Sequence, residues 1–176
     1  MAAAPDTPQA PRPAVARFAM SAAEYAEGLR AIMRRQPTFW VGPVLGVAML
    51  TVGLAKGETL ALVWGCIMLA IAGGSFWVVP ALRWRQSPRL QEEQEHTFSD
   101  GGIFVRAGKD KGQLPWDFYV KAAETQHVYV LLRNGRQGNF VPKRGFVSPD
   151  AEATFRALAA VHLRTSWRPD GSGPAG

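Results

Sequence analysis

The sequence predicts an α+β protein in which a transmembrane helical hairpin is joined to a small antiparallel β domain, barrel-like in shape and capped by a C-terminal α-helix. Three observations lead to this prediction. Residues 39–79 are apolar except for Lys56 and Glu58. Residues 90–147 alternate short strand patterns with turn signals, and an amphipathic helix pattern starts at residue 149.

The chain before the apolar stretch divides into a tail and a short folded segment at 14–37. Residues 1–13 are rich in Ala and Pro, so we expect a disordered tail. Residues 14–18 can form a strand, and Ser21 with Glu24 makes the Ser-x-x-Glu capping box that opens a helix. This helix could lie on the membrane surface or pack on the β domain, and its narrow apolar stripe favours the β domain. The stripe consists of Tyr25, Leu29, Ile32 and Met33, opposite Glu24, Glu27, Arg34 and Arg35.

The apolar stretch is too long for one transmembrane helix. At 1.5 Å per residue it would extend about 60 Å, roughly twice the hydrocarbon thickness of a bilayer. Split at Gly57, it gives spans of about 39–55 and 60–79 within a hairpin at 38–82. Lys56 and Glu58 match the dipoles of the two helices, and Gly57 is free to adopt the left-handed turn conformation. A pair of core helices in a soluble protein is the alternative, but 176 residues leave too little other protein to enclose them.

Arginines flank the predicted hairpin on one side only, which predicts that both termini lie in the cytoplasm. We therefore expect a multi-pass protein of the bacterial inner membrane. The formal net charge of +6 comes largely from these arginines, which we expect to meet lipid headgroups rather than nucleic acid. Lys56 is the one positive residue of the turn. The positive residues that flank the hairpin are Arg12, Arg17, Arg30, Arg34 and Arg35 before it and Arg83, Arg85 and Arg89 after it.

Small residues recur along both predicted spans and should allow close helix packing. Because the short turn already makes the spans neighbours, we expect these residues to pack the two helices of one hairpin together. A homo-oligomer formed through the same face is the alternative. The glycines concerned are Gly42, Gly46, Gly53 and Gly65.

The β domain is expected over residues 90–163. Its first part reads as a polar strand at 91–98, a turn at 99–102, a strand at 103–107 and a second turn at 108–112. Residues 114–122 then have the period of a strand with one buried face. In that strand, Trp116, Phe118, Val120 and Ala122 alternate with Asp117, Tyr119 and Lys121.

The second part of the domain contains a predicted hairpin and a helix. A strand at 127–133 reaches Asn134-Gly135, the strongest hairpin signal in the chain, and returns through 136–141. Ser148 and Pro149 then read as the N-cap and first residue of a helix, and 164–176 as a disordered tail. A domain this small is marginally stable alone, so the N-terminal strand or helix should complete it, although the sequence does not say whether that strand joins the sheet.

The order of these parts resembles the YcxB-like family, over roughly residues 14–163. The resemblance implies a pleckstrin-homology-like (PH-like) fold, a bent antiparallel sheet capped by a C-terminal helix, and it implies no particular activity. Two features depart from the family pattern, the polar strand at 91–98 and the Ala- and Pro-rich tail. The residues that carry the resemblance are LPWDFYV at 114–120, VYVLL at 128–132, VPKRGF at 141–146, and Phe155 and Leu158 in the last helix.

The sequence predicts no catalytic, cofactor or metal site, and we do not expect an enzyme. His96, His127 and His162 are widely spaced, and Cys66 has no second cysteine with which to form a disulfide or a zinc site. The glycines between 101 and 112 fit neither the P-loop nor the dinucleotide-binding fingerprint.

One basic group near the predicted hairpin tip is a candidate for contact with lipid phosphate. Charges at loop tips are usually only solvated, which is the alternative. The group consists of Arg133, Arg136, Lys143 and Arg144.

Three functions therefore stay open for this chain. The first is a membrane-anchored interaction or scaffold domain whose protein partner the sequence does not identify. The second is a lipid-headgroup sensor at the inner membrane surface. The third is an accessory subunit of a membrane transport complex, which is disfavoured because the spans offer few polar groups to line a path: Thr51, Cys66 and Ser75.

Overall fold

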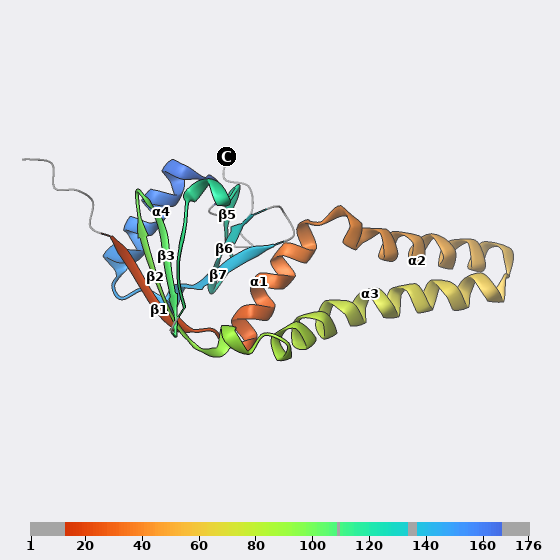
Figure 1. The fold of residues 1–176 in the computed structure, drawn as a ribbon. Helices are drawn as coiled ribbons and strands as arrows, with labels where there is room; N and C mark the ends of the chain where they lie inside the picture. Colours follow the sequence, from red (N-terminus) through yellow and green to blue (C-terminus); the bar gives the residue numbers. More distant parts are fainter. Residues whose placement is uncertain (1–12, 109, 134–136, 167–176) are drawn as a thin grey trace, which may run out of the picture.

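The computed structural model describes residues 13–108, 110–133 and 137–166 (Figure 1). Two four-stranded sheets, two helices that pack on them and a projecting pair of helices make up this part of the chain, which confirms the α+β class, although the described strands do not close into a barrel. The tails expected at 1–13 and 164–176 lie almost wholly outside the described residues. The elements are β1 (Ala14–Ala19), α1 (Ala22–Arg35), α2 (Pro37–Lys56), α3 (Thr59–Arg85), η1 (Pro88–Gln91), β2 (Glu93–Ser99), β3 (Gly102–Ala107), β4 (Asp110–Leu114), η2 (Trp116–Phe118), β5 (Lys121–Glu124), β6 (Val128–Leu132), β7 (Gly138–Pro142), η3 (Lys143–Gly145), α4 (Pro149–His162) and β8 (Arg164–Ser166).

The N-terminal strand completes the first sheet, which has the order β1-β2-β3-β4 and is antiparallel throughout. β1 pairs with β2 so that Ala14 lies opposite Phe98 and Ala19 opposite Glu93. The two segments that flank the helical hairpin are therefore hydrogen-bonded to each other. The hairpin is an insertion between neighbouring strands of one sheet, and the sequence had left this pairing open.

The second sheet has the order β7-β6-β5-β8. Its β6 and β7 are antiparallel, as the predicted hairpin requires, while the turn residues 134–136 lie outside the described residues. β8 pairs in parallel with β5, placing Lys121 opposite Arg164. Residues 164–166, expected in the C-terminal tail, are thus part of the sheet. β8 begins directly after Leu163, which is buried in the core.

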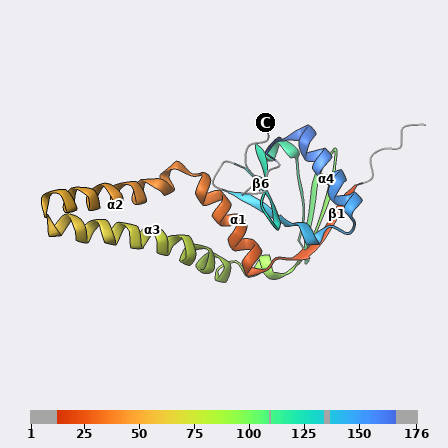
Figure 2. The ribbon, with the colours of Figure 1, turned by 180° about the vertical axis from the view of Figure 1, so that it is seen from behind.

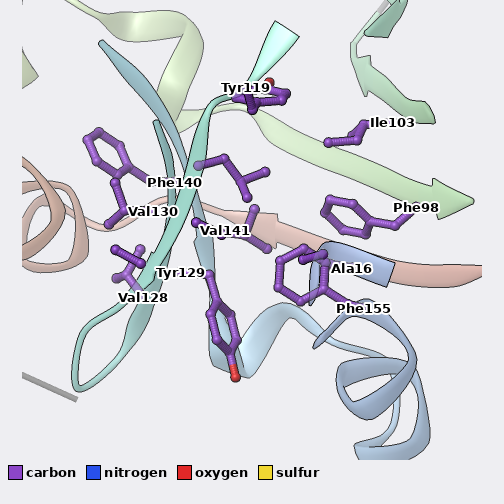
Figure 3. Close-up of a cluster of buried hydrophobic side chains, with 14 of the residues drawn as sticks. Ala16, Phe98, Ile103, Tyr119, Val128, Tyr129, Val130, Phe140, Val141 and Phe155 are labelled. Atoms are coloured by element: carbon purple, nitrogen blue, oxygen red, sulfur yellow. The ribbon is translucent and has the colours of Figure 1, made fainter. Parts of the chain in front are cut away.

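The core lies between the two sheets and α4 (Figure 3). The rings of Phe98 and Phe155 approach to 4.6 Å between centroids, and the ring of Tyr129 lies 5.1 Å from that of Phe155. α4 starts as predicted, because the Ser148 side chain accepts a hydrogen bond from the Ala151 amide and a proline is the first helical residue. This helix covers the end of the domain that lies away from the helical hairpin (Figure 1).

The strand predicted over 114–122 is wrong. Residues Trp116–Phe118 form a 3-10 turn after Pro115, and β5 begins only at Lys121. The turn shifts the alternation, so Tyr119 is buried with 3% of its surface exposed, whereas Val120 is 59% exposed. The indole of Trp116 is fixed by a 2.7 Å hydrogen bond from its Nε1 to the carbonyl of Ser99. The turn predicted at 108–112 is also too long, because β4 begins at Asp110.

Within the described part of the chain, α2 and α3 are long and apolar enough to cross a membrane. They run side by side away from the sheets in both views of the molecule (Figures 1 and 2). Gly57 ends α2 in the left-handed conformation, with φ of 70°, which confirms the predicted turn. The four glycines singled out in the sequence lie along the contact between the two helices, where a Cβ atom on Gly46 would lie 3.2 Å from the carbonyl oxygen of Gly65. A Cβ atom on Gly42 would lie 3.9 Å from that of Ala72, and one on Gly53 would lie 2.7 Å from Cγ of Leu62.

Candidate functional site

α1 packs against both the helical hairpin and the sheets and links the two parts of the molecule. Its capping box is formed as predicted, with Glu24 and Ser21 bonded reciprocally. Its apolar stripe packs on the β domain as expected, and the Tyr25 ring meets the Phe140 ring edge-on at 5.5 Å. The other side of Tyr25 faces the Trp84 ring of α3 at 5.7 Å. α1 therefore contacts both parts of the molecule with one face.

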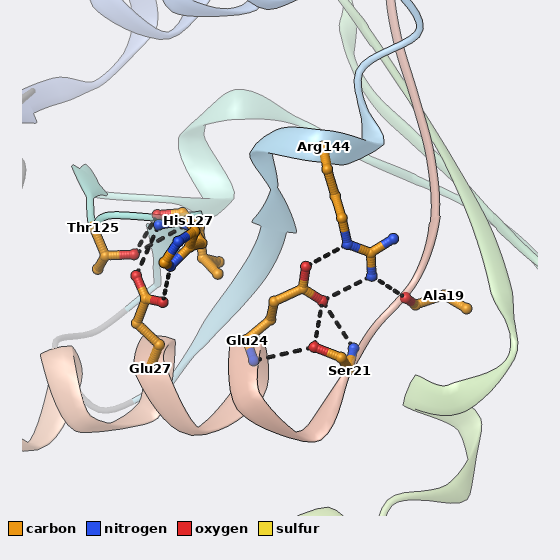
Figure 4. Close-up of polar contacts among 8 residues, drawn as sticks. Ala19, Ser21, Glu24, Glu27, Thr125, His127 and Arg144 are labelled. Atoms are coloured by element: carbon orange, nitrogen blue, oxygen red, sulfur yellow. Dashed lines mark hydrogen bonds and ion pairs between the residues drawn. The ribbon is translucent and has the colours of Figure 1, made fainter.

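The first polar contact between α1 and the β domain is an ion pair between Glu24 and Arg144 (Figure 4). Arg144 Nη2 donates to Glu24 Oε2 and to the carbonyl of Ala19, both at 2.9 Å, and Ser21 donates to the same carboxylate. Burial acts to raise the pKa of Glu24, but the hydrogen bonds from Arg144 and Ser21 outweigh it, and the net pKa is lowered. The sequence had placed Glu24 on the exposed face, whereas this carboxylate is buried.

A second set of polar contacts joins α1 to the loop between β5 and β6 (Figure 4). The backbone amide of His127 donates to Glu27 Oε1 at 2.9 Å, and His127 Nδ1 lies 2.9 Å from Glu27 Oε2. Burial acts to raise the pKa of Glu27, and hydrogen bonds from Thr125 and His127 more than compensate, so the pKa is lowered. Both carboxylate oxygens of Glu27 are therefore engaged with the β domain.

A third polar network lies within the domain, around the buried Glu124. Lys143 Nζ donates to this carboxylate at 2.6 Å and Arg156 Nη2 donates at 3.2 Å. Close by, the Tyr129 hydroxyl donates to Glu152 Oε1 at 2.6 Å. Burial and the hydrogen bond to Glu152 raise the pKa of Tyr129 well above its ordinary value. The arrangement stabilises charges inside the fold and leaves Lys143 bound to an internal carboxylate.

The basic residues that the sequence singled out do not form one cluster. Arg133 precedes β7 and its guanidinium lies 4.1 Å from the centroid of the Phe118 ring, whereas Lys143 and Arg144 follow the other end of the same strand. A five-residue strand separates the two ends by about 17 Å. Lys143 and Arg144 are each paired with a carboxylate, and Arg136 lies outside the described residues.

A cleft of about 360 Å³ lies beside α1, between the two sheets and the end of α3. Its walls are mostly apolar, and its polar lining includes Gln94, His96 and Arg83. His96 is buried, and its Nε2 lies 3.3 Å from the Gln94 side-chain oxygen. The size and apolar lining fall in the range of small-ligand and side-chain binding sites. No sequence pattern predicts this cleft, because its walls come from elements that lie far apart in the chain.

The described residues contain no group of three or more His, Cys, Asp or Glu side chains that could hold a metal ion. His96, His127 and His162 lie in separate surroundings. His96 is in the core, His127 is paired with Glu27, and His162 stacks on Trp116 at 5.2 Å. Chemically, the arrangement joins two parts of the chain and leaves a cleft with mostly apolar walls, and the residues in the described part of the chain do not bring an acid, a base and a nucleophile together.

The fold and this junction define a class of protein: an α+β domain of two sheets fastened through one helix to a long apolar helical hairpin. Within this molecule, residues 98–159 match the family model described as YcxB-like protein, which confirms the resemblance over that part of the chain. The comparisons with curated proteins and with solved structures gave no match.

Proposed function

We propose that this protein is a two-span protein of the bacterial inner membrane that holds a PH-like interaction domain at the cytoplasmic surface. The charge distribution supports the orientation, because the turn of the hairpin has one positive residue, Lys56, and the opposite end has several arginines. The two sheets capped by α4 support the PH-like description. The proposed role is to bind a protein partner, and no catalytic activity is proposed.

The observation that carries this proposal is the attachment of α1 to both parts of the molecule. Glu24 and Glu27 bond to the β domain, and Tyr25 packs between Phe140 and Trp84. Several contacts along one helix hold the domain in a fixed position relative to the hairpin, where a flexible linker would let it move. Anything bound in the adjacent cleft would be held next to the membrane surface.

The lipid-sensor alternative based on the hairpin-tip residues is less well supported. Lys143 and Arg144 already neutralise Glu124 and Glu24, so binding a lipid phosphate there would first require these pairs to break. A transport role also lacks support, since the polar residues described within α2 and α3 are few and the Thr51 hydroxyl is bonded to its own helix.

Site-specific photocrosslinking in native membranes tests the interaction role. A photoreactive amino acid replaces Leu90, which lines the cleft, and a control replaces Val161, an exposed residue of α4. We expect a discrete protein adduct at Leu90 that is absent at Val161 and is lost when Leu29→Trp fills the cleft. Adducts that are the same at both positions, or only lipid adducts at Leu90, would contradict the proposal.

A topology experiment tests the membrane placement. Reporter tags on the two ends should both be protected in intact cells, and a cysteine in place of Glu58, in a Cys66→Ser background, should be labelled from outside. Tags that emerge on opposite faces would exclude a two-span hairpin.

A further inference from the structure

Two arginines of α1 lie over aromatic rings of α3 at the base of the hairpin. The Arg30 guanidinium carbon is 4.2 Å from the centroid of the Trp77 ring and 5.5 Å from that of Phe76. The Arg34 guanidinium carbon is 5.3 Å from the Phe76 centroid. Trp40 of α2 holds the same turn of α1 by donating from Nε1 to the carbonyl of Arg34 at 3.1 Å. The rings therefore support two cations that lie one helical turn apart.

Neither guanidinium has a hydrogen-bond acceptor or a carboxylate partner among the residues that the structure describes, and Arg30 Nε is buried without an acceptor. Glu27 lies one turn before Arg30, but both of its oxygens already accept hydrogen bonds from His127. Arg144, in contrast, forms an ion pair with Glu24. A cation–π contact covers one face of a guanidinium, and its N–H donors, which point outward in the plane of the group, stay available to an acceptor.

The depth of these residues follows from helix length. α2 has 20 residues and at 1.5 Å per residue is about 30 Å long, equal to the hydrocarbon thickness of a bilayer. Residues 59–78 of α3 cover the same distance, so Phe76 and Trp77 come at the cytoplasmic boundary. Arg34 lies just outside Pro37, where α2 begins. Both guanidinium groups are thus placed at the level of the lipid phosphates.

A hollow of about 290 Å³ runs along this side of α1 and is lined by Arg30, Arg34, Glu27 and Gln126 among others. Two cations and one carboxylate that is already engaged leave the hollow with a net positive charge. Guanidinium groups bind phosphate oxygens through paired N–H donors, and this bonding is strongest where water is partly excluded. The hollow has room for a phosphate and the adjoining part of a headgroup.

We propose that Arg30 and Arg34, supported by Phe76 and Trp77, form a binding site for the phosphate of an anionic phospholipid of the inner leaflet. The site rests on the proposed membrane placement of the hairpin. It is separate from the cleft and from the hairpin-tip arginine, and it would fix how deeply the domain sits against the bilayer. An anionic lipid is favoured over a zwitterionic one because the carboxylate that could bind an ammonium group is occupied by His127.

Native mass spectrometry of the full chain in a non-ionic detergent, with phosphatidylglycerol or phosphatidylcholine added, tests this site. We expect the wild-type chain to retain phosphatidylglycerol about tenfold more strongly than Arg30→Gln/Arg34→Gln, a difference of about 1.4 kcal/mol. The matched control Arg85→Gln/Arg89→Gln removes two exposed positive charges at the same end of the hairpin and should retain the lipid as the wild type does.

A second variant, Trp77→Leu, keeps both charges and removes one supporting ring, and it should weaken retention severalfold. Equal retention of the two lipids by the wild-type chain, an equal loss in the matched control, or displacement by inorganic phosphate would each overturn the proposal. Unchanged retention in both Arg30→Gln/Arg34→Gln and Trp77→Leu would do the same. The crosslinking and topology experiments do not depend on these residues, so failure of the lipid site is distinguishable from failure of the proposed function.

Discussion

Protonation of His96 should destabilise the β domain at mildly acidic pH. The imidazole has 3% of its surface exposed, contacts the Phe18 ring edge-on at 5.1 Å, and has no hydrogen-bond partner at Nδ1 among the described residues. Arg83 is the charged residue on the described lining of the adjacent cleft, so no carboxylate there would favour the imidazolium. Burial accordingly lowers the pKa of His96 from 6.5 to about 4.

The size of the effect follows from proton linkage. Because the folded-state pKa lies below the unfolded value, His96 takes up a proton more readily in the unfolded chain. The stabilisation from keeping it neutral is present above about pH 6.5 and is lost as the pH falls toward about 4. We integrate the difference in bound protons between the unfolded and folded chain over pH, using these two pKa values. The free energy of unfolding should then drop by about 2 kcal/mol from roughly pH 7 to roughly pH 5.

The assay is urea unfolding of the full chain in detergent, followed by near-ultraviolet circular dichroism of the buried aromatic residues of the β domain. His96→Phe, which places an apolar ring among Phe18 and Phe98, should remove this part of the pH dependence. His162→Gln is the matched control for the loss of an imidazole. The reasoning would be refuted if His96→Phe kept the wild-type pH dependence, or if the NMR signal of His96 titrated in the folded chain with a midpoint near 6.5.

Two further predictions concern the fastening of α1 and the packing of the hairpin. Arg144→Leu leaves the buried Glu24 carboxylate without its cation and should lower the free energy of unfolding by about 1 to 2 kcal/mol. This value already allows for the partial exposure of Arg144, which weakens the ion pair. Unchanged urea unfolding of the variant would contradict this prediction. Gly65→Val should lower the melting temperature in detergent, because a Cβ atom there would lie 2.7 Å from Cγ of Leu50 and the overpacking costs about 1 to 3 kcal/mol. Gly73→Val meets nothing within 4 Å and is the control, so equal melting of the two variants would count against close helix packing at Gly65.

The candidate sites depended on placements that the sequence could not supply. Composition located arginines on one side of the hairpin, but it could not tell that Arg144 is paired with a carboxylate 120 residues earlier while Arg30 and Arg34 are not. Arg30 and Arg34 read as ordinary flanking charges in the sequence. Their significance came from the aromatic rings of α3, which are adjacent only because α1 folds back along that helix.

The sequence by itself determined the features that depend on neighbouring residues. Length and charge defined the helical hairpin, Gly57 its turn, and Ser21 and Ser148 the starts of α1 and α4, because hydrophobic periodicity and helix caps act within a few residues. Only the tertiary structure decided the pairing of β1 with β2, the parallel addition of β8, and the ion pair of Glu24 with Arg144. These contacts join segments far apart in the chain, and their energies depend on how whole elements are oriented, which no local pattern specifies.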